Sequence, residues 1–319
     1  NLQLYSNRVK MVKSFKIYNN FNIQSNHKGS IILIGNFDGL HLGHQKLFRL
    51  AKKFKKKYSL KIGVLTFEPM PKMFFNKSLR NFRISNQKQK ISLLKNFDVD
   101  FIILKKFDKE FSKIKSINFI KNILSSKLKA KFIFVSNNFK FGNKREGNVR
   151  QLIKYESFCK YKIIKPKPLI KRKKIISSSL IRNLIQSGKL NQANKFLSRK
   201  WSIVGKVLKG RQLGKKIGFP TANIDIKDYI IAKPGVYAVS VKKQNSIKFI
   251  KGIANLGYRP TFNQKKILLE VHLFNFSGNL YNKYLTVNFL KFIRKEKKFK
   301  NIGQLQKQIK IDLLRAKNT

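Results

Sequence analysis

The chain has 319 residues, of which 42% are hydrophobic and 27% charged, with 72 Lys and Arg against 13 Asp and Glu. This length allows one or two domains, and 28 Phe exclude a wholly disordered chain. Apolar runs fall far short of the roughly 18–20 residues that span a bilayer, and the first 30 residues hold no secretory signal. The single cysteine, Cys159, excludes an internal disulfide. We therefore expect a cytoplasmic protein in a reducing compartment, without a membrane partner.

The formal net charge is +59, and two explanations for it are possible. A basic surface attracts nucleic-acid phosphates. Compositional drift is the alternative, because only 13 of the 72 basic residues are Arg, and Asn, Ile and Phe are abundant as well. The lysines are spread along the whole chain and form no single stripe, which favours drift. We expect no specific nucleic-acid partner, and non-specific binding of polyanions as a consequence of the charge.

The first half of the chain alternates strand-like and helix-like segments. Short apolar runs predict strands over 30–35, 60–67, 99–104 and 131–136. Apolar residues at spacings of three and four predict helices over 44–58 and 111–124. This alternation is typical of a parallel sheet with helices on both faces.

The second half has closely spaced strand-like segments separated by glycine turns. The predicted strands are 201–208, 235–241, 248–255, 267–276 and 285–292, followed by a helix over 302–316. This pattern predicts an antiparallel sheet, such as a closed barrel. Between the halves, residues 188–197 predict a connecting helix.

Residues 35–44 read GNFDGLHLGH and follow an apolar strand. A glycine turn between a strand and a helix lets backbone N–H groups approach an anion closely. His41 and His44 are three residues apart, so they fall on the same side of the first helical turn. Imidazoles there can donate hydrogen bonds to phosphate and stabilise charge that develops on phosphorus. A structural or metal-binding pair is the alternative, although no third ligand is evident among the four histidines.

Residues 205–224 read GKVLKGRQLGKKIGFPTANI and lack the Walker pattern. The glycines permit tight turns and the basic residues can contact phosphates, but an ordinary basic hairpin would look the same. Thr221 and Asn223 are two residues apart, so in an extended segment they face the same side and offer oxygen ligands to a cation.

Glu270 lies in the segment KILLEVHLFNF and shares a strand face with His272. It is either a structural carboxylate at the rim of the core or a base that accepts a proton from a hydroxyl. No acid neighbours it, which excludes half of a glycosidase pair.

Four segments resemble, in chain order, the FAD synthetase branch of the nucleotidyltransferases. They are GNFDGLHLGHQKL (35–47), TFEPMP (66–71), SNNFKFGNKREG (136–147) and ISSSLIR (176–182). The resemblance implies a Rossmann-like domain in which an FMN phosphate attacks the α-phosphorus of ATP and pyrophosphate leaves. No protein nucleophile is required, because positioning and charge stabilisation suffice.

The resemblance also implies roles for individual residues. The implied catalytic residues are His41, His44 and Arg182, with Arg182 and Ser178 on the β- and γ-phosphates. The remaining implied nucleotide-binding residues are Gly35, Phe37, Asp38, Gly39 and Asn138. Two departures stand out: Met70 replaces the usual histidine of TFEPHP, and LSRKW (197–201) replaces a segment like LGRPY. We expect Met70 to weaken adenylyl transfer.

The second half resembles the riboflavin kinase domain through five segments. They are GFPTANI (218–224), PGVYA (234–238), GIANLGYRPTF (252–262), LEVHLFNFSGNLY (269–281) and FIRKEKKF (292–299). The whole chain thus resembles the prokaryotic bifunctional riboflavin kinase/FAD synthetase family, which implies a six-stranded antiparallel flavokinase barrel with a terminal helix. The implied domains are 1–186 (FAD synthetase), 187–200 (connecting helix) and 201–319 (riboflavin kinase).

By this resemblance Glu270 is the base that activates the ribityl 5′-hydroxyl, and Arg294 borders the flavin. Thr221 and Asn223 would hold Mg²⁺ and ATP phosphates. Four residues of the preceding loop would cover the ATP: Gly210, Gly214, Lys215 and Gly218. The substrates and products implied are ATP, riboflavin, FMN and FAD, with Mg²⁺ neutralising charge between phosphates.

Two alternatives are kept. In the first the chain is a riboflavin kinase only, with a decayed adenylyltransferase site, as Met70 and the drift suggest. In the second it is a basic RNA-binding protein, which would need a concentrated basic patch or an aromatic platform, and neither is visible.

Overall fold

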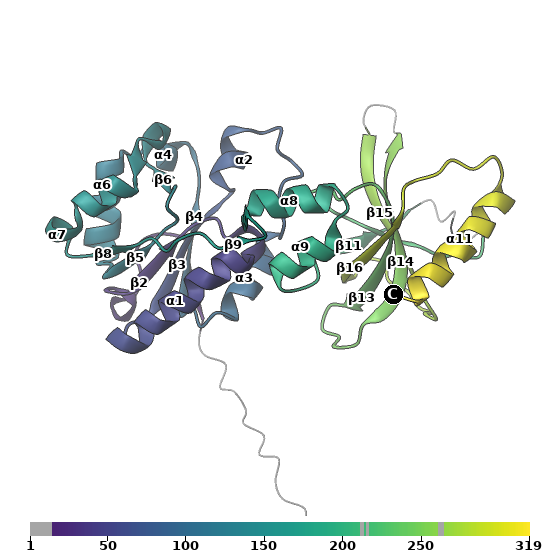
Figure 1. The fold of residues 1–319 in the computed structure, drawn as a ribbon, viewed down its shortest axis with the longest axis horizontal. Coiled ribbons are helices and arrows are strands. Elements are labelled where there is room, and N and C mark those ends of the chain that lie inside the picture. Colours follow the sequence, from purple (N-terminus) through teal and green to yellow (C-terminus); the bar gives the residue numbers. More distant parts are fainter. Residues whose placement is uncertain (1–14, 211–213, 215–216, 261–264) are drawn as a thin grey trace, which may run out of the picture. The chain divides into compact units, whose positions relative to one another are not determined.

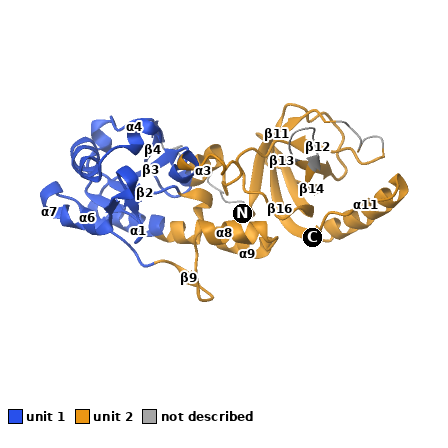
Figure 2. Ribbon diagram, turned by 90° about the horizontal axis from the view of Figure 1, so that it is seen from above, with its two compact units in different colours: residues 1–36, 47–74, 94–167 blue, residues 37–46, 75–93, 168–319 orange. Residues whose placement is uncertain are grey.

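The computed structural model describes residues 15–210, 214, 217–260 and 265–319. These form two compact units. Unit 1 comprises residues 1–36, 47–74 and 94–167, and unit 2 comprises residues 37–46, 75–93 and 168–319 (Figure 2). Among the described residues no helix is both long enough and apolar enough to cross a membrane.

Unit 1 contains a six-stranded sheet in the order β1-β4-β3-β2-β5-β8, and every pairing in it is parallel (Figure 1). The strands are β1 (Lys16–Tyr18), β2 (Ile31–Ile34), β3 (Ile62–Glu68), β4 (Phe101–Lys106), β5 (Phe132–Phe134) and β8 (Lys162–Ile164). All four residues of β2 are buried, because this strand lies inside the sheet. The four strands predicted in this half are confirmed; β1 and β8, of three residues each, were not predicted.

Helices connect these strands, as the alternating pattern predicted. The longest is α1 (Leu42–Tyr58), whose first residues belong to unit 2. The stretch predicted as one helix over 111–124 is broken into three parts: α4 (Lys109–Ser112), α5 (Ser116–Asn118) and the wider η3 (Phe119–Lys127). The other elements of unit 1 are η1 (Ser25–His27), α2 (Pro71–Phe75), β6 (Lys140–Phe141), η4 (Asn143–Arg145), β7 (Gly147–Asn148), α6 (Val149–Lys154) and α7 (Glu156–Cys159).

Unit 2 contains a closed antiparallel barrel in the order β11-β12-β15-β14-β13-β16. The strands are β11 (Ser202–Leu208), β12 (Ala222–Ile224), β13 (Gly235–Lys243), β14 (Ile250–Pro260), β15 (Lys265–Leu273) and β16 (Tyr284–Arg294). Alternate residues of β11 are buried, as expected when one face of a strand lines a filled barrel. The predicted six-stranded barrel is confirmed, and so are the five strands predicted from the sequence pattern; β12 was not predicted.

The helix α11 (Ile302–Lys317) follows the barrel, as predicted, and packs on it through Ala316 against Val236, Ala238 and Ile253. Asn301 caps this helix by accepting a hydrogen bond from the Gln304 N–H at 2.9 Å.

Unit 2 also includes elements that precede the barrel in the chain. These are η2 (Asp38–Leu40), α3 (Gln87–Lys95), the hairpin β9 (Ile170–Lys171) and β10 (Lys174–Ile175), α8 (Ser178–Gln186) and α9 (Leu190–Leu197); the end of α3 belongs to unit 1. Ser177 caps α8. The buried Trp201 joins them to the barrel, because its ring packs on Phe289 of β16 and its indole N–H donates to the Ile84 carbonyl at 2.9 Å. The predicted connecting helix is α9.

Candidate functional site

The first site is the turn between β2 and α1. Gly35 belongs to unit 1, where its N–H donates to the Leu65 carbonyl at 3.1 Å, so the strand ends beside β3. The chain then enters unit 2 with Phe37 and Gly39, both in the left-handed backbone region at φ values of 48° and 76°. This conformation allows a turn tight enough to bring His41 and His44 onto the first turn of α1.

His41 and His44 lie stacked, with ring centroids 3.8 Å apart. Burial, followed by the charges of Arg182 and Arg199, lowers the pKa of His41 to about 4. Burial also holds the pKa of His44 well below its ordinary value. Both rings are therefore neutral at pH 7, and each offers one N–H donor and one acceptor nitrogen. The Nδ1 atoms of both rings are buried and find no hydrogen-bond partner in the described part of the chain.

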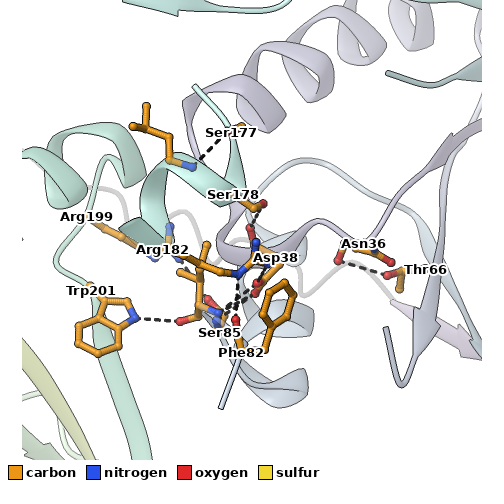
Figure 3. A network of polar contacts seen from close by, with 12 residues as sticks. Asn36, Asp38, Thr66, Phe82, Ser85, Ser177, Ser178, Arg182, Arg199 and Trp201 are labelled. Carbon is orange, nitrogen blue, oxygen red and sulfur yellow. Dashed lines mark hydrogen bonds and ion pairs between the residues drawn. The ribbon is translucent and has the colours of Figure 1, made fainter. Parts of the chain in front are cut away.

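The carboxylate of Asp38 organises the residues around this turn (Figure 3). It accepts hydrogen bonds from the Ile84 N–H at 3.0 Å and the Ser85 N–H at 3.1 Å. It also forms an ion pair with Arg182 at 2.7 Å, with both side chains largely buried. The Ser178 hydroxyl donates to the Asp38 carbonyl at 3.0 Å. Asp38 and Ser178 thus lie close together, and their role in nucleotide binding stays a prediction.

Arg182 contacts protein groups on two sides. Its Nε–H donates to the Phe82 carbonyl at 2.9 Å, and its guanidinium lies over the Phe82 ring, 3.7 Å from the centroid. Together with the Asp38 ion pair, these contacts fix the guanidinium. The role of holding ATP phosphates stays a prediction for this residue.

Two further residues of the predicted site belong to unit 1. Asn138 is exposed and accepts a hydrogen bond from the Ser136 hydroxyl at 2.9 Å. Met70, which stands where the resembling motif has histidine, is buried with 3% of its surface exposed and precedes α2. A histidine here would have to replace a buried apolar side chain.

The second site lies on adjoining strands of the barrel. Glu270 of β15 is directly opposite Asn223 of β12 on one side and Asn255 of β14 on the other. Residues paired across antiparallel strands have Cβ atoms about 4.5–5.5 Å apart, so the two amide side chains flank the carboxylate. The structure thus brings together Glu270 and Asn223, to which the resemblance gives roles at the kinase site, and those roles stay a prediction. The sequence gave no reason to expect Asn255 beside them.

Glycines bring a loop against Thr221 and Asn223. A Cβ atom at Gly214 would lie 2.4 Å from the Phe219 carbonyl oxygen, so a side chain is excluded there. A Cβ atom at Gly210 would lie 1.6 Å from the Asn223 amide nitrogen, so a side chain there would displace the Asn223 amide. Gly218 has open space around it and a φ of +85°, so glycine is favoured there by the left-handed backbone of a turn. Lys215 lies outside the described residues.

The donor atoms at this second site suit a magnesium ion. The Asn223 Oδ1 atom is buried and has no hydrogen-bond partner among the residues described. The Thr221 hydroxyl is two residues away on an exposed side chain. Amide, hydroxyl and carboxylate oxygens are ligands that Mg²⁺ accepts together with phosphate oxygens. Clusters of three or more His, Cys, Asp or Glu that could hold a metal ion do not occur in the described residues.

Arg294, predicted to border the flavin, forms an ion pair with a residue that sequence reasoning missed. Its Nε–H donates to both carboxylate oxygens of Asp312 on α11, at 2.8 and 3.0 Å, and Asp312 is 1% exposed. Gln308 donates to the same carboxylate at 3.0 Å. This contact fastens the terminal helix to the end of β16. The flavin role of Arg294 stays a prediction.

Sequence reasoning also missed Arg199 and Gln45, which hold the histidine turn. Arg199 donates to the Gly39 carbonyl at 2.8 Å, and the Gln45 amide donates to the Leu40 carbonyl at 3.0 Å. The signal was present in part, because Arg199 lies in the segment LSRKW that was compared with LGRPY.

Each half of the chain matches the model of a known protein family. The family model for FAD synthetase matches residues 23–180, and the model for riboflavin kinase matches residues 197–319. A bifunctional riboflavin kinase/FMN adenylyltransferase of Buchnera aphidicola subsp. Schizaphis graminum is 39% identical over 92% of this chain and 94% of its own length. The protein of the same description from Escherichia coli K12 is 33% identical over the same shares.

A solved structure has the same fold along nearly its whole length. It is described as a macrolide-efflux protein from Streptococcus pneumoniae, and it superposes with a TM-score of 0.85 at 29% identity, covering 96% of this chain and 99% of its own. The chain belongs to the family of bifunctional riboflavin kinase/FMN adenylyltransferases.

Proposed function

We propose that this chain phosphorylates riboflavin to FMN with one ATP and then adenylylates FMN to FAD with a second, releasing pyrophosphate. The observation that carries the proposal is the match to relatives of both activities over 92% of the chain. The stacked neutral histidines and the Glu270–Asn223 pair supply the matching chemistry in two separate places.

For adenylyl transfer, we assign the histidines to the phosphates of ATP. An FMN phosphate oxygen attacks the α-phosphorus, the bond to the bridging oxygen breaks, and pyrophosphate leaves. His41 and His44 are neutral, and their buried Nδ1 atoms have no hydrogen-bond partner among the described residues, so the rings can donate N–H groups to the phosphate oxygens as charge develops. We assign Gly35, Phe37, Gly39, Asn138 and Ser178 to nucleotide binding.

For Asp38 and Arg182 we propose a structural role beside the nucleotide-binding role that the resemblance implies. Their ion pair joins the histidine turn to α8 and to residues 82–85. We therefore propose that Arg182 fixes this turn through Asp38, in addition to the phosphate contact that the resemblance implies.

For phosphorylation, we assign Glu270 as the base that takes the proton of the ribityl 5′-hydroxyl as this oxygen attacks the γ-phosphorus of ATP. Thr221 and Asn223 would hold Mg²⁺, which neutralises charge between the phosphates. Gly210, Gly214 and Gly218 shape the loop over this site, and Arg294 stays a candidate for the flavin border.

The direct test is to incubate the purified protein with riboflavin, ATP and Mg²⁺ and to separate the flavins by chromatography. We expect FMN first and FAD later. FMN without FAD would favour the kinase-only alternative and point to Met70. A folded sample that forms neither flavin would refute the proposal. RNA binding would then be the alternative function to test.

A further inference from the structure

The turn that carries the histidines has an unfavourable backbone. Phe37 and Leu40 have φ values of 48° and 38°, in the left-handed region that favours glycine. Residues with a side chain are strained in this region, because the Cβ atom lies too close to the following carbonyl oxygen. The conformation of the turn therefore depends on contacts from other parts of the chain.

The segment 197–199, which connects α9 to the barrel, supplies several of these contacts. The Arg199 guanidinium donates to the Gly39 carbonyl at 2.8 Å, in the middle of the strained turn. Gln45, on the other side of the histidines, donates to the Ser198 hydroxyl at 2.6 Å and the Leu197 carbonyl at 3.2 Å. The histidines thus lie between two points that the same segment holds.

Arg199 is itself fixed within a small polar network (Figure 3). Besides Gly39, its guanidinium contacts the Leu197 carbonyl at 3.2 Å and the Ser85 hydroxyl at 3.4 Å. The Ser85 N–H donates to Asp38, so the network closes on the same turn. A planar guanidinium can reach three acceptors in different directions, which an ammonium group of lysine does poorly.

We propose that Arg199 is a positioning residue for adenylyl transfer, because it fixes the Gly39 carbonyl and so sets where His41 and His44 stand. The inference rests on the proposed function of the histidines. It makes the segment 197–199, which the predicted domains place outside the FAD synthetase domain, part of the adenylyltransferase machinery.

Arg199 also affects the histidines electrostatically. Its positive charge is one of the causes that hold the pKa of His41 low, together with burial and Arg182. The other titratable or charged groups around this turn are His44, stacked on His41, and Asp38, paired with Arg182. Removing the charge of Arg199 should raise the pKa of His41, whereas Arg199→Lys should leave it low.

The test compares Arg199→Met and Arg199→Lys with the full-length protein, and uses Lys200→Met, an exposed neighbour, as the matched control. FMN-to-FAD and riboflavin-to-FMN conversion are measured in the same samples. We expect Arg199→Met to lower kcat for FAD formation at least tenfold and to leave FMN formation within twofold. Arg199→Lys should lower FAD formation severalfold, and Lys200→Met should change neither.

Histidine NMR gives a readout that does not depend on activity. The chain has four histidines, so the ring signals can be assigned by single replacements. We expect the titration of His41 to move to higher pH in Arg199→Met and to stay in place in Arg199→Lys. A general loss of structure would lower both activities and would not produce this split.

Two results would overturn the inference: FAD formation at the wild-type rate in Arg199→Met, or an equal loss of both activities in a folded sample. If Arg199→Met does not fold, Arg199→Lys decides, and a wild-type rate of FAD formation in it counts against the proposal. If the wild-type protein makes no FAD, the proposed function fails instead, and the His41 titration still tests the placement of Arg199.

Discussion

At the scale of residues, burial decides the chemistry of the two histidines. The spacing in HLGH predicted that both would share one side of a helical turn, and the structure adds that their rings stack. The neutrality of His41 could not be predicted, because it arises from burial and from Arg182 and Arg199, which are distant in sequence.

The low pKa of His41 predicts how the enzyme depends on pH. The rate of FAD formation should be insensitive to His41 ionisation from pH 8 to about 5 and should fall as this ring protonates near pH 4.

The stability of the fold should also decrease as pH falls. Between pH 6.5 and about 4 the unfolded chain binds more protons than the folded one, so the free energy of unfolding decreases as pH falls.

The size of this stability effect can be measured. The shift of His41 corresponds to on the order of 3 kcal/mol, fully present above pH 6.5. Urea unfolding at several pH values, in the wild type and in His41→Gln, separates this contribution from those of other groups. An equal slope of stability against pH in both proteins would contradict the account.

Glu270→Gln should abolish the formation of FMN and leave FMN-to-FAD conversion intact. A general base contributes typically 10²–10⁴-fold, and glutamine preserves the shape of the side chain without accepting the proton. His44→Ala should do the reverse. The measurement is chromatography of flavins from reactions started with riboflavin or with FMN, with thermal unfolding to show that each variant is folded. Loss of both activities in either folded variant would contradict the assignment of two sites.

At the scale of elements, long strands and helices could be predicted and short ones could not. The periodicity of α1, β3, β13 and α11 extends over seven or more residues, which is enough to identify each. Three strands, β1, β8 and β12, have only three residues each. They form because they pair with neighbouring strands of the sheet or barrel. The segment 82–85 has no periodic signal, and only the folded chain brings Ile84 to both Asp38 and Trp201.

The ion pair between Arg294 and Asp312 should stabilise the docking of α11. Asp312→Ala should lower the free energy of unfolding by about 3–5 kcal/mol, because it leaves a largely buried guanidinium without its carboxylate. Asp225→Ala is the control, since its pair with the exposed Lys227 should contribute at most about 1 kcal/mol. Denaturant unfolding measures both, and equal effects would show that the buried pair has no special role.

At the scale of the whole molecule, the compact units do not coincide with the predicted domains. Residues 37–46 and 75–93, which the sequence assigned to the FAD synthetase half, cluster with the barrel. Long-range contacts such as the Arg83 N–H to the Asp228 carbonyl at 2.8 Å produce this arrangement, and local sequence patterns carry no information about them. The bounds 1–186, 187–200 and 201–319 stay a prediction.

The net charge of +59 should cause weak, non-specific binding of polyanions. RNA should be retained at low ionic strength and released steeply as salt rises, without preference for sequence. Filter binding between 20 and about 300 mM salt checks this, since screening shortens to about 8 Å at physiological ionic strength. Sequence-selective binding that persists at high salt would instead support the RNA-binding alternative.

The central claim is that one chain carries two separate sites that act in succession. Mixing Glu270→Gln with His44→Ala tests it most directly, with riboflavin, ATP and Mg²⁺ as the starting materials. We predict that the first variant alone forms no flavin product and the second stops at FMN. The mixture should form FAD, because FMN released by one protein is adenylylated by the other. A mixture of folded variants that makes FMN and no FAD would contradict the account.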